Sequence, residues 1–168
     1  AEIIATVIDC FNEIGISDFQ IEIGQIDYFK GLVAESGISE DEEDQIKEYI
    51  HIKNFFGLEE YVDALDISDS LKKAFVAFDS LFGGISMLDK AEGYVSNETS
   101  LEAVKRLRRV YAALECYGYQ DHISFDLGML DGYNYYTGII FRGYTYGTGD
   151  AVVKGGRYNN LLKQFGKD

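Results

Sequence analysis

Two apolar arms joined by a glycine-rich connection constrain the fold of this chain more than any other feature. The arms, residues 137–146 and 151–158, are rich in β-branched and aromatic side chains, and Gly147-Thr-Gly-Asp150 joins them. This pattern predicts a β-hairpin. Tyr135, Tyr136 and Tyr158 would then lie at its outer ends, where their rings could converge on a small ligand. Gly155 and Gly156 have no Cβ, so the backbone there can approach another group closely.

Two further segments alternate between apolar and polar residues and therefore predict strands. Phe19, Ile21 and Ile23 alternate with Gln20 and Glu22, and a second alternating segment covers residues 122–127. With the hairpin, they predict an antiparallel sheet of about residues 18–24, 122–128, 137–147 and 150–156, in an α+β fold with helices on one face. The polar side chains either face water or form part of a pocket floor. The sequence also leaves open which face of residues 139–146 packs on the helices.

Residues 25–119 predict a mostly helical insertion between the first two strands, preceded by a helix over residues 1–15. Ser39 followed by Glu and Asp residues up to Asp44 is typical of an N-cap and an acidic first turn. Residues 96–100 supply caps for a long helix that follows them, and Gly83-Gly84 interrupts the helical pattern. His51 lies alone on one of these helices, which favours a surface or packing role over a catalytic one.

The length of 168 residues fits a single domain, residues 1–168, with a core large enough to need no disulfide. Cys10 and Cys116 lie inside apolar helical patterns, which predicts buried thiols rather than a disulfide or a metal site. The sequence has no apolar run of membrane-spanning length and no charged-then-apolar leader. These features predict a cytoplasmic protein.

The formal net charge of −14 argues against nucleic acid as the main partner, because phosphate binding needs a basic surface. The charge is uneven: residues 1–70 hold 18 of the 29 acidic residues and 3 of the 15 basic ones. The basic residues that cluster, Lys105, Arg106, Arg108 and Arg109, fit a solvated helix face. We therefore expect no nucleic-acid partner and no membrane partner.

The sequence shows few arrangements that could carry chemistry. Two His and two Cys are too few and too scattered for a metal site. We find no nucleophile elbow, no phosphate-binding P-loop and no dinucleotide fingerprint, so no cofactor is expected. The tyrosines of the hairpin remain, and packing alone explains most tyrosines in a chain that has 13.

Two motifs in the hairpin region resemble a known family. Residues Tyr135-Tyr-Thr-Gly138 and Gly155-Gly-Arg-Tyr158 are similar, in order and spacing, to the two histidine signatures of histidyl-tRNA synthetases, Arg-Gly-Leu-Asp-Tyr-Tyr-Thr-Gly and Gly-Gly-Arg-Tyr-Asp-Gly-Leu. The resemblance implies a class II synthetase-like core. It also implies that Tyr135, Tyr136, Gly155, Gly156, Arg157 and Tyr158 form a histidine site, with Tyr136 and Tyr158 contacting the ligand.

The departures from the family pattern indicate a member without synthetase activity. The arginine that opens the first signature, which assists aminoacylation, is Asp131 here, and a carboxylate has no donors for a phosphate and repels its charge. The signature's Asp is Asn134, and the acidic residue that usually follows its Phe is Arg142.

These departures resemble the synthetase-like regulatory subunits of short-form ATP phosphoribosyltransferase. That resemblance implies a non-catalytic protein of histidine biosynthesis that binds histidine as a feedback inhibitor. It would form a hetero-oligomer with the short catalytic subunit and self-associate.

A complete class II site needs one further motif on each side of these residues. The chain therefore resembles an internal piece, or a naturally trimmed form, of a longer protein. A fragment of a working histidyl-tRNA synthetase remains the alternative, and an unrelated amino-acid-binding module is all that composition alone supports.

Overall fold

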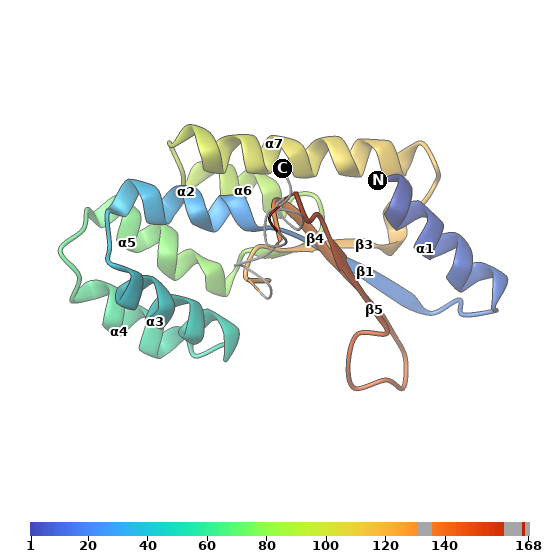
Figure 1. Ribbon diagram of the computed structural model, residues 1–168, viewed down its shortest axis with the longest axis horizontal. Coiled ribbons are helices and arrows are strands. Elements are labelled where there is room, and N and C mark those ends of the chain that lie inside the picture. Colours follow the sequence, from blue (N-terminus) through green and yellow to red (C-terminus); the bar gives the residue numbers. More distant parts are fainter. Residues whose placement is uncertain (131–135, 160–165, 167–168) are drawn as a thin grey trace.

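The computed structural model describes residues 1–130, 136–159 and 166, and within them a five-stranded mixed sheet carries the fold (Figure 1). Its strand order is β2-β3-β1-β4-β5. The strands are β1 (Phe19–Gln25), β2 (Phe82–Gly83), β3 (Ile123–Asp126), β4 (Ile139–Thr145) and β5 (Val153–Gly156). The helices are α1 (Glu2–Glu13), α2 (Ile26–Ser36), α3 (Glu40–His51), α4 (Phe55–Asp63), α5 (Asp69–Val76), α6 (Met87–Gly93) and α7 (Glu98–Glu115), with 3-10 turns at Ala77–Asp79 and Gln120–His122.

The predicted hairpin is confirmed as the antiparallel pair β4–β5, and β1 pairs antiparallel with β4. The predicted α+β class is confirmed as well. One pairing differs from the expected antiparallel sheet, because β1 and β3 are parallel. A parallel pair needs a long crossover, and the helical block between these two strands supplies one. That block also contains a strand of its own, the two-residue β2, which pairs antiparallel with β3 where Gly83-Gly84 interrupts the helical pattern.

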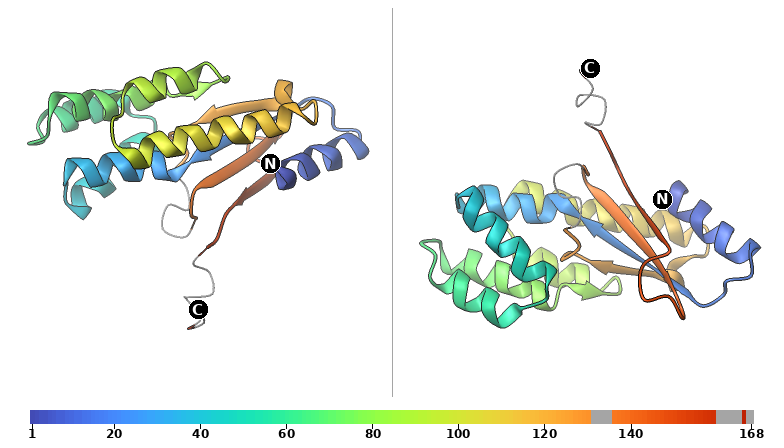
Figure 2. Two further views of the ribbon diagram at one scale, coloured as in Figure 1. Left: turned by 90° about the horizontal axis from the view of Figure 1, so that it is seen from above. Right: turned by 60° about the horizontal axis from the view of Figure 1, so that its bottom comes forward.

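Helices α1 and α7 cover one face of the sheet, and Figure 2 shows α7 running across it. The rings of Phe11 (α1) and Phe19 (β1) lie 5.0 Å apart, and those of Tyr111 (α7) and Phe125 (β3) lie 6.0 Å apart. On β4, the side that faces this core carries Phe141 and Gly143, which settles the orientation that the sequence left open.

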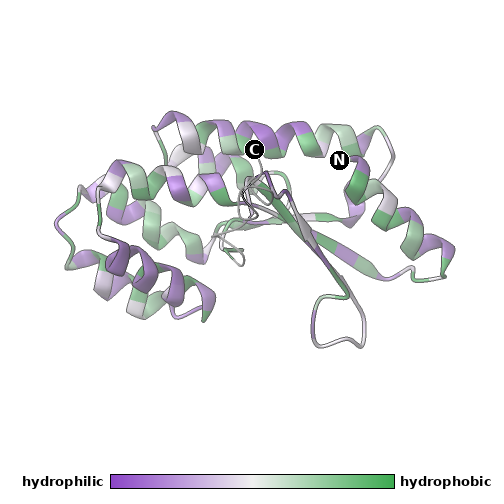
Figure 3. Ribbon diagram, in the orientation of Figure 1, coloured by the Kyte–Doolittle hydropathy of each residue, from purple (hydrophilic) through white to green (hydrophobic). Residues whose placement is uncertain are grey.

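The helical block α2–α6 extends beyond one end of the sheet, and its helices show the apolar and polar stripes expected of amphipathic segments (Figures 1 and 3). The helix caps follow the sequence closely, both in this block and in α7. Ser39 forms a complete capping box with Glu42 at the start of α3, and the Asn97 side chain accepts a hydrogen bond from the Ser100 N–H at the start of α7. Such caps satisfy backbone N–H groups that have no partner within the helix.

The two cysteines correct the sequence expectation, since both are exposed. Helix α1 buries the stripe of Ile4, Ile8 and Phe11, and Cys10 lies outside that stripe. Cys116 follows the last turn of α7, where its Sγ contacts the carbonyl oxygen of Ala112 at 3.4 Å. Within the part of the chain that the structure describes, every helix is too short or too polar to cross a bilayer.

Candidate functional site

The open end of the β4–β5 hairpin brings the two signature segments together. Gly156 lies opposite Ile140 across the two strands, and the Tyr136 ring packs on Gly156 so closely that a Cβ there would lie 2.5 Å from its Cδ1. Gly155 does the same on the other face, where a Cβ would lie 2.5 Å from the Phe141 ring. Both glycines therefore serve close approach, and the groups that approach are aromatic rings of this chain.

Tyr136 and Tyr158 form an aromatic pair at this end of the hairpin. Their ring centroids are 4.6 Å apart, with the ring planes at 59°. Tyr136 is half-buried, while Tyr158 is 43% exposed. The pair thus presents one sheltered ring and one accessible ring from two segments that the strand pairing holds together.

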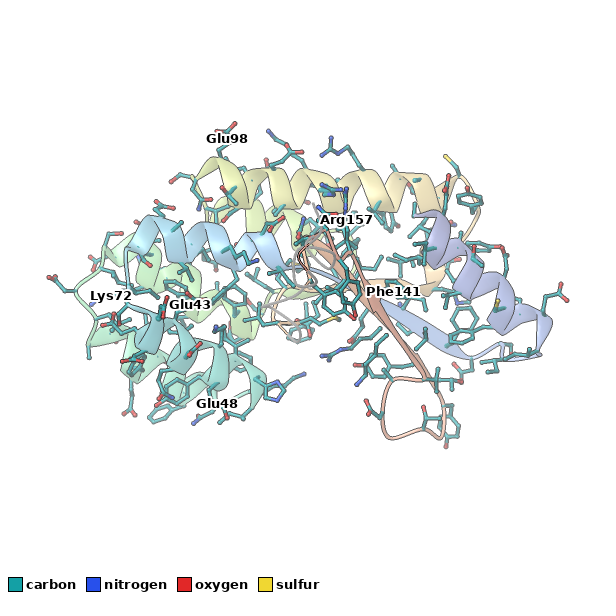
Figure 4. The ribbon with its side chains drawn as sticks, viewed as in Figure 1. Glu43, Glu48, Lys72, Glu98, Phe141 and Arg157 are labelled. Carbon is teal, nitrogen blue, oxygen red and sulfur yellow. The ribbon has the colours of Figure 1, made fainter. Side chains whose placement is uncertain are left out.

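Arg157 stabilises the end of the hairpin mainly through hydrogen bonds of its backbone. Its carbonyl oxygen accepts a hydrogen bond from the Thr137 N–H at 2.7 Å, and its own N–H donates to Ile139. Its exposed side chain donates through Nε to the Asn159 side chain at 2.6 Å. Figure 4 labels Arg157 at this end of the strand pair. The residue fixes the geometry on which the two tyrosines depend.

The sheet face away from α1 and α7 carries polar side chains, and we call it the polar face. It is made up of Gln20, Glu22, Ser124, Asp126, Arg142, Tyr144 and Lys154, all partly or fully exposed. Glu22 lies opposite Ser124 on β3 and opposite Arg142 on β4. The polar side chains of β1 therefore belong to a continuous charged surface that begins beside Tyr136.

Two carboxyl groups on the polar face have raised pKa values. Burial is the main cause of the raised pKa of Glu22 and the charge of Asp126 adds to it, while Arg142, Lys53 and a hydrogen bond from Tyr144 lower it. Burial also raises the pKa of Asp126, against a hydrogen bond from the Gly128 N–H and the charges of Lys53 and Arg142. Two partly desolvated carboxylates side by side favour a nearby cation.

Lys53 places a positive charge near both carboxylates from outside the sheet. It follows α3 in a left-handed conformation (φ 55°), and its N–H donates to Ile50 while the next N–H, of Asn54, donates to Tyr49. This hydrogen-bond pattern is a Schellman motif, whose left-handed position is usually glycine. A lysine there accepts backbone strain. Its charge acts on both Glu22 and Asp126.

A cavity of about 50 Å³ lies where the aromatic pair meets the polar face. Tyr136, Arg142 and Lys154 line it, together with Met129, Ile140, Phe141 and Gly155. The site therefore combines a phenol, two cations and apolar walls, which suits the polar end of a small organic ligand better than a metal. Among the described residues, no group of His, Cys, Asp and Glu side chains is arranged to hold a metal ion.

Comparison with known proteins places the chain in a family. The family model described as "Histidyl-tRNA synthetase" matches residues 1–168. The chain belongs to the histidyl-tRNA synthetase family.

Individual relatives within this family refine the comparison. A protein of Acetivibrio thermocellus named ATP phosphoribosyltransferase regulatory subunit is 45% identical over 167 residues, which cover 99% of this chain and 40% of the relative. The crystal structure of an ATP phosphoribosyltransferase regulatory subunit/histidyl-tRNA synthetase from Bacillus halodurans matches with a TM-score of 0.89 and 31% identity, over 99% of this chain and 44% of that one. The chain therefore spans less than half the length of these relatives.

The ATP phosphoribosyl transferase (HisG:HisZ) complex of Thermotoga maritima contains a chain of the same fold. Its TM-score is 0.71 at 19% identity, over 90% of this chain and 53% of that one.

Of the six histidine-site residues inferred from the signatures, the structure brings Tyr136, Gly155, Gly156, Arg157 and Tyr158 to one end of the hairpin. Tyr135 lies outside the described residues, as do Asp131 and Asn134. Sequence reasoning missed Asp126, Lys154 and Lys53 as parts of the same surface. The alternation of β1 and β3 gave a signal for Asp126, whereas nothing in the sequence indicated that Lys53 reaches the polar face.

Proposed function

We propose that this chain is the synthetase-like body of a non-catalytic regulatory subunit of short-form ATP phosphoribosyltransferase, and that it binds histidine as a feedback signal. One observation carries the proposal. A member of the synthetase family that is nearly half identical to a named regulatory subunit has Asp131 where the synthetase signature has its arginine. That substitution removes the guanidinium that neutralises phosphate charge during aminoacylation.

Histidine is the ligand that the site chemistry supports. An imidazole needs an apolar slot and a hydrogen-bonding partner, and the pair Tyr136 and Tyr158 offers both. The ammonium and carboxylate groups of an amino acid need charged partners, which the polar face has in Glu22 and Arg142. Histidine bound at this surface would contact both the hairpin tyrosines and the charged side chains of the polar face.

The partner in this proposal is the short-form catalytic subunit, in a hetero-oligomer that also contains further copies of the regulatory chain. The names of the relatives and the fold shared with a chain of the Thermotoga maritima complex support this partner. The proposal places the protein in the cytoplasm with its catalytic subunit. It involves no cofactor and no nucleic acid.

Co-purification of the intact protein with a short-form catalytic subunit tests the assembly. We expect a stable complex, higher phosphoribosyltransferase activity than that of the catalytic subunit alone, and inhibition of that activity by histidine. A mixture that elutes as separate proteins, with unchanged activity, would refute the proposal.

A working histidyl-tRNA synthetase is the second candidate, and the description of the matching family model favours it. Aminoacylation of cognate tRNA with ATP and histidine separates the two candidates. We expect no charging, and steady charging would establish the synthetase instead.

A further inference from the structure

One line of side chains crosses four strands of the polar face at a single register. Ser124 on β3 lies opposite Glu22 on β1, Glu22 opposite Arg142 on β4, and Arg142 opposite Lys154 on β5. Side chains at one register on neighbouring strands have their Cβ atoms only about 4.5–5.5 Å apart. We call these four residues the charge row. Its charge changes sign between β1 and β4, so it has an acidic end and a basic end.

The basic end pairs two like charges. Arg142 and Lys154 lie directly opposite each other, and like charges in this arrangement destabilise a sheet. The Asp150 carboxylate is 3.3 Å from the Lys154 ammonium, but both groups are exposed, and exposed ion pairs contribute little. Both cations also line the cavity next to Tyr136. A like-charged pair at a cavity is suited to an anionic group with two oxygens.

The acidic end brings two carboxylates near each other on a diagonal, because Glu22 lies opposite Ser124 and Asp126 lies two residues further along β3. Glu22 and Asp126 lie on neighbouring parallel strands, and each is partly desolvated by its surroundings. The cations whose charges act on both are Lys53 and Arg142. This end favours a cationic group on the ligand.

We propose that the charge row recognises the zwitterionic end of a free amino acid, with the ligand carboxylate on Arg142 and Lys154 and its ammonium group on Glu22. A ligand held in this way directs its side chain along β4 toward Tyr136 and Tyr158. This inference rests on the proposed function, because histidine is the amino acid that the tyrosine pair would select. To the charged partners Glu22 and Arg142 it adds Lys154, and it adds the register that sets all three in one row for the part common to all amino acids.

Calorimetric titration of the intact protein with three related ligands tests the proposal. L-Histidine has both charged groups, histamine lacks the carboxylate, and imidazole propionate lacks the ammonium group. We expect Arg142→Gln and Lys154→Gln to weaken histidine by about ten- to a hundredfold, as the loss of a charged hydrogen bond predicts, and to leave histamine unchanged. Glu22→Gln should weaken histidine and histamine and leave imidazole propionate unchanged.

Two further variants serve as controls for loss of charge and for loss of folding. Lys105→Gln removes a cation from α7 and should change none of the affinities. Arg142→Lys keeps the charge and should retain most of the preference for histidine over histamine, even if Arg142→Gln folds poorly. Equal weakening of histidine and histamine by Arg142→Gln would overturn the proposal, since it would mean that Arg142 acts by holding the fold.

Free glycine separates this inference from histidine sensing. Added to the ¹⁵N-labelled intact protein, glycine should shift the amide signals of Gly143 and Gly155 in the wild type and not in Arg142→Gln. If these shifts appear but histidine does not bind, histidine sensing fails while the charge row remains an amino-acid subsite. If glycine causes no shift in the wild type, the charge row is not such a subsite.

Discussion

The Tyr136 ring occupies the space in which any side chain at position 156 would begin. A Cβ on Gly156 would lie 2.5 Å from Cδ1 and 2.6 Å from Cε1 of that ring, and 2.9 Å from Cγ2 of Ile140. Contacts this short cannot be accommodated without moving the ring or separating the strands. Gly156 of the second signature thus leaves the space that the ring of Tyr136, from the first signature, occupies.

Gly156→Ala should therefore destabilise the intact protein by about 1–3 kcal/mol, the usual cost of overpacking, and displace Tyr136. Urea denaturation measures the first effect, and histidine titration should show a weaker site. Gly149→Ala is the matched control, because a Cβ in the hairpin turn would meet no atom within 4 Å. A stable Gly156→Ala variant with wild-type affinity would show that the close packing of Tyr136 on Gly156 is needed neither for stability nor for binding.

The sequence predicts those parts of the fold that depend on local patterns. Alternating apolar residues identify β1 and β4, and the Ser39 N-cap with its acidic first turn marks the start of α3. These signals suffice because strand and helix periodicity and capping act over a few residues. The signature tetrapeptides likewise identify the hairpin end that holds Tyr136 and Tyr158.

Features that depend on contacts between distant residues cannot be predicted from local sequence patterns. The parallel pairing of β1 with β3 follows from the path of the helical block, which no local pattern encodes. The charge row exists only once register aligns Glu22, Arg142 and Lys154 on three strands. Lys53 adopts a left-handed conformation at a position where glycine is usual. A local sequence pattern therefore does not predict this conformation.

The raised pKa of Asp126 predicts a specific pH dependence of stability. Because burial raises this pKa above its ordinary value near 3.8, the folded protein binds more protons than the unfolded chain between the two values. Stability then falls as pH rises through that window, and the charged form remains a cost at neutral pH. Asp126→Asn keeps an oxygen that can accept from the Gly128 N–H, so its melting temperature at pH 7 should exceed that of the wild type.

Glu42 provides a control of opposite sign for this experiment. Hydrogen bonds from the Ser39 backbone N–H and hydroxyl lower the pKa of Glu42, so its contribution is present above the unfolded pKa and lost as pH falls. Glu42→Gln should therefore lower the melting temperature at pH 7 and change it less in acid. If Asp126→Asn also lowered the melting temperature at pH 7, the burial cost assigned to Asp126 would be wrong.

The left-handed conformation of Lys53 implies backbone strain that substitution by glycine should relieve. A left-handed conformation costs a non-glycine residue roughly 1–2 kcal/mol. Lys53→Gly should therefore be more stable than Lys53→Ala by about 1 kcal/mol, although both variants remove the same charge from the polar face. Comparing the two in urea denaturation isolates the backbone effect, and equal stabilities would show that the strain is absent.

The last prediction concerns the hydroxyl groups of Tyr136 and Tyr158 and their part in histidine binding. A hydroxyl that hydrogen-bonds a neutral ligand group contributes roughly 0.5–1.5 kcal/mol, and leaving a buried partner unpaired costs roughly 1–3 kcal/mol. Tyr136→Phe and Tyr158→Phe in the intact protein should then weaken histidine binding about three- to a hundredfold, at about 1.4 kcal/mol per decade.

Both tyrosine variants should fold normally, because phenylalanine keeps the rings whose centroids lie 4.6 Å apart. Tyr146→Phe is the control, since Tyr146 is 90% exposed near the hairpin turn and its hydroxyl is far too accessible to be a buried ligand partner. Calorimetric titration of histidine into the four proteins decides between packing and recognition. Equal affinities in all of them would mean that Tyr136 and Tyr158 serve only to pack the hairpin end.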